Sequence, residues 1–305
     1  MDLREIIQAI RAEFTDLNPP AGAEDLSELE RLFGGLPEQV LMLYRDHNGS
    51  NGIPHLNGRR LAARLMPIRE VLKIQTAMAA LSDRLPTVAP VMWLWADDNS
   101  NYCGVFTEGT LSGSLCAFNH DEPMLTPAFR SITSFMSRLL IEVRSLSQSG
   151  VCDIPSVPRE IPELEPNEVN RRHDMELAQH FRDQYVNESS EGLRRLYAFC
   201  SVCLTPFKDT DNVTLFLEDR DMWIPEAAVH LLELRQWKGS TELLEKLAQE
   251  GRPNGDAAAI RLLARMDTSD SRQAIERLRQ TLRGQKLKVL EMWTDPRRLI
   301  LPASW

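Results

Sequence analysis

The chain has 305 residues, of which 43% are hydrophobic, and a formal net charge of -9. A chain of this length ordinarily forms two domains, each with its own core. Residues 1–150 carry 13 basic and 18 acidic side chains and residues 151–305 carry 22 and 26, so neither half is basic. Because duplex binding requires Lys and Arg gathered on one face, we expect no direct nucleic-acid partner.

The sequence shows no membrane-spanning or secretory segment. It contains no apolar run of about 18 residues and no apolar leader with a small-residue cleavage site. Its five cysteines are odd in number and scattered, unlike the dense, even framework of a small secreted fold. We therefore expect a cytoplasmic protein with no membrane partner.

Three amphipathic helices are predicted at the start of the chain. Apolar residues of the first recur every three or four positions, and the pattern stops before Asn18. The second helix ends at Gly34. The third runs from Pro37 to His47, and we expect Asn48-Gly49 to form its left-handed cap.

A strand-rich block follows these helices. Proline in the first short strand indicates a sheet edge, and glycines separate the last two strands, as in an antiparallel meander. A strong helical pattern begins at Ile132. The predicted elements are a strand at Leu65 to Ile68, a helix at Arg69 to Leu81, and strands at Val91 to Ala96, Tyr102 to Thr107 and Ser114 to Phe118.

The segment after the strand Val91 to Ala96 is rich in acidic and amide side chains. It contains Asp97, Asp98 and Asn101, but it lacks the glycine and glutamate of an EF-hand loop. Two interpretations stay open: a polar hairpin turn, which we favour, or an acidic recognition loop on the rim of the sheet. Trp93 and Trp95 are predicted to share one face of their strand, most simply in the core.

Two further groups of residues carry possible chemistry. Cys200 and Cys203 could ligate zinc or cycle as a dithiol, but no second pair supplies more ligands, so a buried helix position is favoured. His120, Asp121 and Glu122, with His47 of the same domain, could form a metal or acid/base site, although adjacent residues on a turn diverge, which favours a solvated loop. Because no familiar catalytic motif is present, we expect a non-enzymatic protein without cofactor or metal.

The second half is predicted to be helical. Residues 149–166 contain repeated prolines and acids, typical of an extended linker between domains at 1–148 and 167–305. A shift of 31 residues aligns Ala228 to Leu232 with Ala259 to Leu263, and Leu244 with Ile275. Each aligned unit reads as two helices joined by a polar turn, which favours a stacked helical repeat.

The order of elements in residues 24–145 resembles the SUKH superfamily, which includes the Smi/Knr-type fungal regulators and many bacterial immunity proteins. The residues that carry the resemblance are Leu36-Pro37, Tyr44, Asn48-Gly49, Met66-Pro67-Ile68, Trp95-Ala96-Asp97-Asp98, Asn101-Tyr102 and Ser134-Phe135. The resemblance implies an α+β fold: a SUKH-like N-terminal domain with a mostly antiparallel sheet and flanking helices. An all-α, HEAT-like helical-repeat domain is expected to follow it.

The resemblance also implies a function. Many bacterial members bind and neutralise a toxin, often a nuclease or deaminase, so an immunity protein with a protein partner is expected. The positions that match the family's binding cleft are Asn48, Asp97, Asp98, Asn101 and Tyr102. The alternative is an intracellular scaffold or adaptor that binds a protein partner through the helical half.

Overall fold

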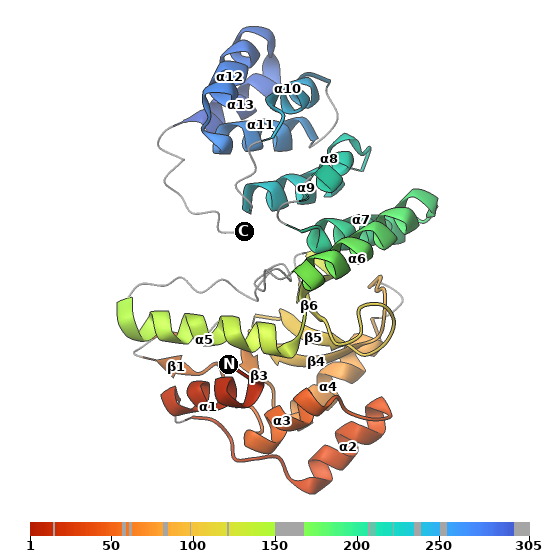
Figure 1. Ribbon diagram of the computed structural model, residues 1–305, viewed down its shortest axis with the longest axis vertical. Helices are drawn as coiled ribbons and strands as arrows, with labels where there is room; N and C mark the ends of the chain where they lie inside the picture. The colour runs from red at the N-terminus through yellow and green to blue at the C-terminus, as the bar shows by residue number, and fades with distance from the viewer. Residues whose placement is uncertain are drawn as a thin grey trace. The chain divides into compact units, whose positions relative to one another are not determined.

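The computed structural model describes residues 1–295 except 15, 57–58, 61–62, 82–84, 98, 121, 150–167, 207–208, 210, 222, 235–238 and 251–254. The chain divides into two compact units, Met1–Asn170 and Arg171–Trp305 (Figure 1). The predicted linker lies outside the described residues except for its first position, Ser149. Asp98 also lies outside them.

The first unit begins with the predicted amphipathic helix. Helix α1, Leu3–Glu13, starts at a capping box in which Asp2 and Glu5 bond each other's backbone N–H groups. Its buried residues are those of the predicted stripe, namely Leu3, Ile6, Ile7 and Ile10. This stripe packs mainly against helix α5, Ile132–Ser149.

Helix α2, Ala23–Phe33, ends at Gly34 with a left-handed φ of 68°, as its sequence predicts. Helix α3, Glu38–Asp46, starts after Pro37, but its end differs from the prediction. The cap is His47 in an extended conformation, because the chain turns directly towards the sheet there. Gly49 has a positive φ of 64° for another reason: a Cβ on it would lie 2.3 Å from the Leu65 carbonyl oxygen.

A five-stranded antiparallel sheet forms the centre of this unit, in the order β3-β4-β5-β6-β7. The predicted meander is confirmed, and β3 is an edge strand. Strand β7 was not predicted, because its two prolines suit only a sheet edge, which is where it lies. The strands are β3 (Arg64–Leu65), β4 (Val91–Ala96), β5 (Tyr102–Phe106), β6 (Leu115–Asn119) and β7 (Glu122–Phe129), with a separate pair β1 (His55–Leu56) and β2 (Arg59–Arg60).

Helix α5 covers one face of the sheet (Figure 1), where Trp95 and Phe129 contact Phe135 with ring centroids 4.7 and 5.2 Å away. Trp93 and Trp95 are both buried, as predicted, but the prediction that they share a face is wrong. A register shift between them pairs Trp93 with Gly104 and Trp95 with Cys103, which lie on opposite faces. Trp93 instead packs beside Phe118.

Helix α4, Ile68–Ala79, supports the edge of the sheet that short strand β3 leaves open. The Gln75 carboxamide donates to the Val91 carbonyl oxygen at 3.0 Å and accepts from the Trp93 N–H at 3.4 Å. One side chain therefore replaces two backbone partners that a longer β3 would supply.

The second unit consists of helices among its described residues. The aligned segments of the sequence repeat fall on α9 and α11 and on α10 and α12, so each aligned unit is a helix pair. Helix α11 packs against α9, α10, α12 and α13. The elements are α6 (Glu168–Asn187), α7 (Glu191–Leu204), α8 (Asp211–Thr214), η2 (Leu215–Glu218), α9 (Trp223–Leu234), α10 (Thr241–Glu250), α11 (Gly255–Met266), α12 (Ser269–Thr281) and α13 (Gly284–Thr294).

Candidate functional site

The polar side chains of the predicted turn after β4 form hydrogen bonds within the turn itself. Asp97 Oδ1 accepts the backbone N–H groups of Asn99 at 2.7 Å and Asn101 at 3.1 Å, and Oδ2 accepts the Asn101 amide at 2.7 Å. Asp97 and Asn101 are only 6% and 3% exposed. Both therefore shape the hairpin and present little polar surface to a partner.

His120 joins the same turn from the end of β6. Its backbone N–H donates to Asn101 Oδ1 at 3.0 Å, and its Nδ1 lies 2.9 Å from that oxygen. The residue is exposed, as a solvated turn requires. The predicted loop is nevertheless too long, because Glu122 already belongs to β7.

Asn48 and Tyr102 are partly exposed, unlike Asp97 and Asn101. Tyr102 begins β5 and packs beside Trp93. Asn48 caps α4, because its Oδ1 accepts the Ile68 N–H at 2.9 Å. Of the predicted binding residues that the structure describes, Asp97, Asn101 and Tyr102 are brought together at one turn, whereas Asn48 is bound to the start of α4.

The junction between α3 and β3 is held by buried polar contacts. The Tyr44 hydroxyl donates to the Met66 carbonyl oxygen at 2.9 Å, and burial raises the pKa of Tyr44, which keeps the donor protonated. Arg64 forms a bidentate pair with Glu70 at 2.7 and 2.8 Å and donates to the Ser50 carbonyl oxygen. These contacts fix the place where the chain passes from helix to sheet.

A small cavity of about 30 Å³ lies beside this junction, and His47 and Arg64 are among its lining residues. His47 is buried, with its Nδ1 3.0 Å from Asp46 Oδ2. Burial lowers the pKa of His47; the Asp46 carboxylate opposes this shift and the Arg11 guanidinium adds to it. The imidazole is therefore held in its neutral form.

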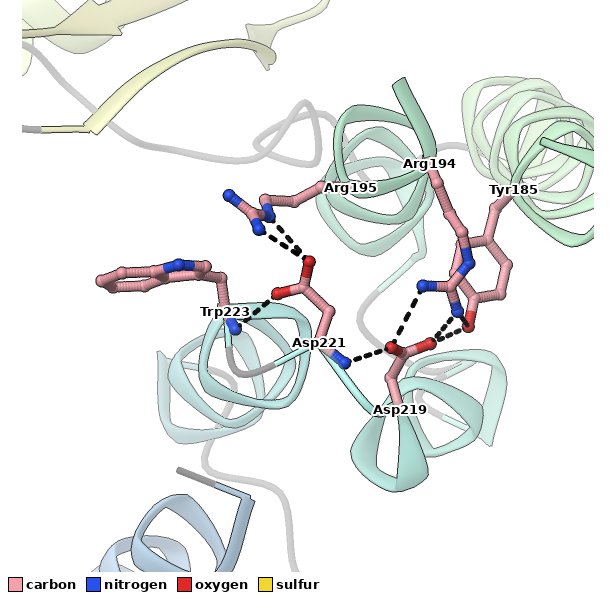
Figure 2. Close-up of polar contacts among 6 residues, drawn as sticks. All are labelled: Tyr185, Arg194, Arg195, Asp219, Asp221 and Trp223. Carbon is pink, nitrogen blue, oxygen red and sulfur yellow. Dashed lines mark hydrogen bonds and ion pairs between the residues drawn. The ribbon is translucent and has the colours of Figure 1, made fainter. Parts of the chain in front are cut away.

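A cluster of charged side chains among the described residues of the second unit was not predicted. It joins Tyr185 of α6, Arg194 of α7 and Asp219 in the turn after η2 (Figure 2). The Arg194 guanidinium donates to the Tyr185 hydroxyl at 2.8 Å and to both Asp219 oxygens, and it stacks on the Tyr185 ring with 4.5 Å between Cζ and the centroid. Three separate chain segments meet at one carboxylate.

Electrostatics keep each member of this cluster in one protonation state. Burial and the hydrogen bond to Asp219 raise the pKa of Tyr185 to about 12, so its phenol stays a donor. Burial alone would raise the pKa of Asp219, but the bonds from Tyr185, Arg194 and the Asp221 N–H lower it overall. The pKa of Arg194 is raised, since bonds to Asp219 and Tyr185 outweigh its partial burial.

A second ion pair, between Arg195 and Asp221, lies beside this cluster (Figure 2). Asp221 Oδ2 accepts from Arg195 Nε at 2.9 Å, and Oδ1 accepts the backbone N–H of Trp223 at 2.8 Å. One carboxylate thus holds an arginine and the first residue of α9 in a fixed relation. The Trp223 residue is 43% exposed, which is unusual for a large aromatic residue.

The acids and bases of this cluster differ in exposure. The Asp219 and Asp221 side chains are 2% and 11% exposed, whereas those of Arg194 and Arg195 are both 31% exposed. Arg220, between the two acids, is exposed as well. Glu218, which precedes Asp219, is also exposed, with 49% of its side chain accessible. We call Arg195 and Trp223, which are linked through Asp221, the Trp223 patch.

Sequence reasoning missed these residues because they lie far apart along the chain and form no motif. Tyr185 and Asp219 are 34 positions apart, and Arg195 and Asp221 are 26 apart. The available signal was the charged sequence from Glu218 to Asp221 beside a tryptophan. That signal is also typical of a solvated turn.

Cys200 and Cys203 both lie on α7, as predicted, but only Cys200 is buried, and Cys203 is partly exposed. Among the described residues, no group of three or more His, Cys, Asp or Glu side chains could hold a metal ion. None of the helices in the described ranges is long and apolar enough to cross a membrane. No protein-family model matches the chain, and no curated protein shows significant similarity to it.

Proposed function

We propose that this chain is a non-enzymatic binding protein of the immunity type, which binds and neutralises a bacterial protein toxin. The observation that carries the proposal is the α3–β3 junction, because several of the residues that carry the SUKH resemblance meet there, namely Tyr44, Asn48-Gly49 and Met66-Pro67-Ile68. Tyr44 bonds Met66, Asn48 caps α4 at Ile68, and Gly49 fits against Leu65 where no side chain could. Residues from two separate parts of the sequence thus contact one another at this junction.

The acidic side chains on the surface of α2 favour a partner with a basic surface, such as the substrate site of a nuclease or deaminase toxin. Helix α2 exposes Glu24, Glu28 and Glu30, which form no ion pair with any described residue, and the neighbouring Leu32 is 50% exposed. Rim charges of this kind speed association with an oppositely charged partner. In this proposal Asn48 and Tyr102 contact the toxin, and Asp97 and Asn101 set the shape of the adjacent turn.

Co-expression with nuclease or deaminase toxins, taken first from any that neighbouring genes encode, tests the function. We expect the wild-type chain to restore growth and to bind the purified toxin. Reversing two exposed charges with Glu24→Arg and Glu28→Arg should weaken binding by about tenfold or more, mainly by slowing association. Glu108→Arg, which reverses one charge on an exposed turn between β5 and β6, is the control for each single substitution. Full toxicity in the presence of the folded chain would refute the proposal.

A second function is favoured by one observation, the exposed Trp223, whose backbone N–H donates to Asp221. Tryptophan and arginine are the residues most enriched at the energetic centres of protein interfaces. An adaptor that binds a partner through the helical unit would use this patch. Loss of partner binding on Trp223→Ala, with no effect of Glu24→Arg and Glu28→Arg, would favour the adaptor over the toxin antagonist.

A further inference from the structure

The loop after α3 contains two Asn-Gly pairs, Asn48-Gly49 and Asn51-Gly52. An Asn-Gly pair can react with itself, because no Cβ shields the backbone nitrogen of the glycine, which can attack the side-chain carbonyl carbon of the asparagine. The reaction requires the asparagine side chain to turn towards that nitrogen. Both pairs have the same two residues, so their surroundings in the fold decide whether each one reacts.

The first pair, Asn48-Gly49, is held in place. Asn48 Oδ1 accepts the Ile68 N–H at 2.9 Å, and the Asn48 carbonyl oxygen accepts from Asn18 Nδ2 at 2.9 Å. Gly49 is buried, and a Cβ on it would lie 2.3 Å from the Leu65 carbonyl oxygen. Turning the Asn48 side chain towards the Gly49 nitrogen would break the cap of α4 in a crowded place. The fold therefore protects this pair.

The second pair, Asn51-Gly52, is exposed. Among the described residues the Asn51 side chain bonds only Asn18, to whose Oδ1 its Nδ2 donates at 3.3 Å. The Gly52 N–H forms no hydrogen bond with any described residue, and no described atom outside its chain neighbours lies within 4 Å of a Cβ placed on Gly52. One long, exposed hydrogen bond is therefore all that must break before the side chain can turn.

We propose that Asn51 is a site of spontaneous deamidation and that Asn48 is protected from it. The Gly52 nitrogen forms a bond to Asn51 Cγ, and the bond from Cγ to Nδ2 breaks. Nδ2 leaves as ammonia, which takes up the proton lost from the Gly52 N–H, and a cyclic succinimide remains. Water, the only co-reactant, then opens the ring to an aspartate or an isoaspartate at position 51. This inference does not depend on the toxin-binding proposal.

Deamidation changes the hydrogen bonding of Asn18. The Asn18 amide links two parts of the loop, because its Oδ1 accepts from Asn51 and its Nδ2 donates to the Asn48 carbonyl oxygen. A carboxylate at position 51 has no proton to donate, and it repels Asn18 Oδ1. If the Asn18 amide turns round to donate to this carboxylate, it loses its bond to Asn48. Either outcome removes one hydrogen bond from the loop that carries Asn48.

Peptide mass spectrometry of the full chain tests the proposal. The protein is kept at mildly alkaline pH for several days and digested briefly with trypsin, which cleaves after Arg45 and Arg59 and so releases both pairs in one peptide. Fragmentation of this peptide locates the gain in mass of about one dalton. We expect Asn51 to react about tenfold faster than Asn48 or more, because Asn48 reacts only when the junction opens locally. Equal rates, or no reaction at Asn51, would overturn the proposal.

Two controls separate the fold from the sequence. In urea, where the chain is unfolded, the two asparagines should react at similar rates; a difference that persists there would show that the fold does not protect Asn48. Gly52→Ala shields the attacking nitrogen and should slow the reaction at Asn51 by about tenfold or more. Because the Cβ enters open space, the variant should fold normally, which circular dichroism checks. An unchanged rate in this folded variant would refute the attack by the Gly52 nitrogen.

Asn51→Asp installs one of the two products directly. Hydrogen exchange in residues 46–59 should be faster in this variant than in the wild type, since the loop has lost a hydrogen bond. Gln273→Glu makes the same change from amide to acid at an exposed position of α12 and should leave this exchange unchanged. Equal exchange in Asn51→Asp and the wild type would contradict the role given to Asn18.

Discussion

Gly49 shows how one residue limits the approach of a helix to a sheet. Its φ of 64° is left-handed, and a Cβ would lie 2.3 Å from the Leu65 carbonyl oxygen and 2.7 Å from the Met66 carbonyl carbon. Contacts that short cannot be relieved by a side-chain rotation, because both partners are backbone atoms. Any side chain at this position must therefore move β3.

We expect Gly49→Ala to destabilise the protein by about 3 kcal/mol or more, since backbone strain and displacement of β3 add together. Gly34→Ala is the matched control, with φ of 68° and no neighbour within 4 Å. It should cost about 1 kcal/mol from backbone strain alone. Urea unfolding of both variants measures the difference; equal losses would show that the close approach to β3 is unimportant.

His47 should make stability depend on pH. Its pKa is lowered chiefly by burial, so the unfolded chain binds a proton more readily than the folded chain does. The stabilisation is complete above the ordinary histidine pKa of about 6.5 and is lost as the pH falls through the lower folded pKa. The free energy of unfolding should therefore decrease on acidification below neutral pH.

Urea unfolding at a series of pH values from neutral downwards checks this expectation. His47→Gln should remove part of the decrease, because glutamine carries no proton that titrates in this range. His173→Gln, at an exposed position of α6, should leave it unchanged. A His47→Gln variant with an undiminished acid response would assign the effect to other groups.

At the scale of elements, the edge of β4 depends on a helix side chain. Gln75→Leu keeps the size of the side chain but leaves the Val91 carbonyl and the Trp93 N–H without their partner. We expect a loss of about 1–2 kcal/mol and faster amide exchange at Trp93. Thr76→Ala, which removes only an exposed hydroxyl bonded to its own helix, should change stability by less than about 0.5 kcal/mol.

The elements themselves follow closely from local pattern. The continuous apolar run Val91 to Ala96 and the periodic stripe of α1 appear where they were predicted. Strand β7 was missed because Pro123 and Pro127 remove backbone donors, and only its position at the sheet edge makes them tolerable. The opposite faces of Trp93 and Trp95 depend on a bulge, which a strict alternation cannot anticipate.

At the scale of the whole molecule, the Asp219 cluster joins segments that are remote in the sequence of the second unit. Asp219→Asn removes the charge that both Arg194 and Tyr185 bind. We expect this unit to lose about 2–4 kcal/mol of stability, because a buried ion pair is broken on one side only. Hydrogen exchange in peptides from α6 and α7 should accelerate.

Glu176→Gln is the control for this experiment, since it removes an exposed charge from α6 without touching the cluster. Its exchange pattern should match that of the wild type. If Asp219→Asn also leaves α6 and α7 unchanged, the cluster does not hold these helices together. Mass spectrometry of the exchanged peptides distinguishes the two outcomes.

The sequence alone determined the α+β character of the first unit, the helical character of the second and the approximate positions of the first helices and of strands β4 to β6, because periodicity and turn residues act over a few positions. It also placed a polar turn at Asp97 to Asn101. Only the tertiary structure decided that the polar groups of this turn hydrogen-bond to one another. It also decided that Tyr185, Arg194 and Asp219 come into contact. Contacts between residues 26 or 34 positions apart depend on how helices pack, which no local pattern encodes.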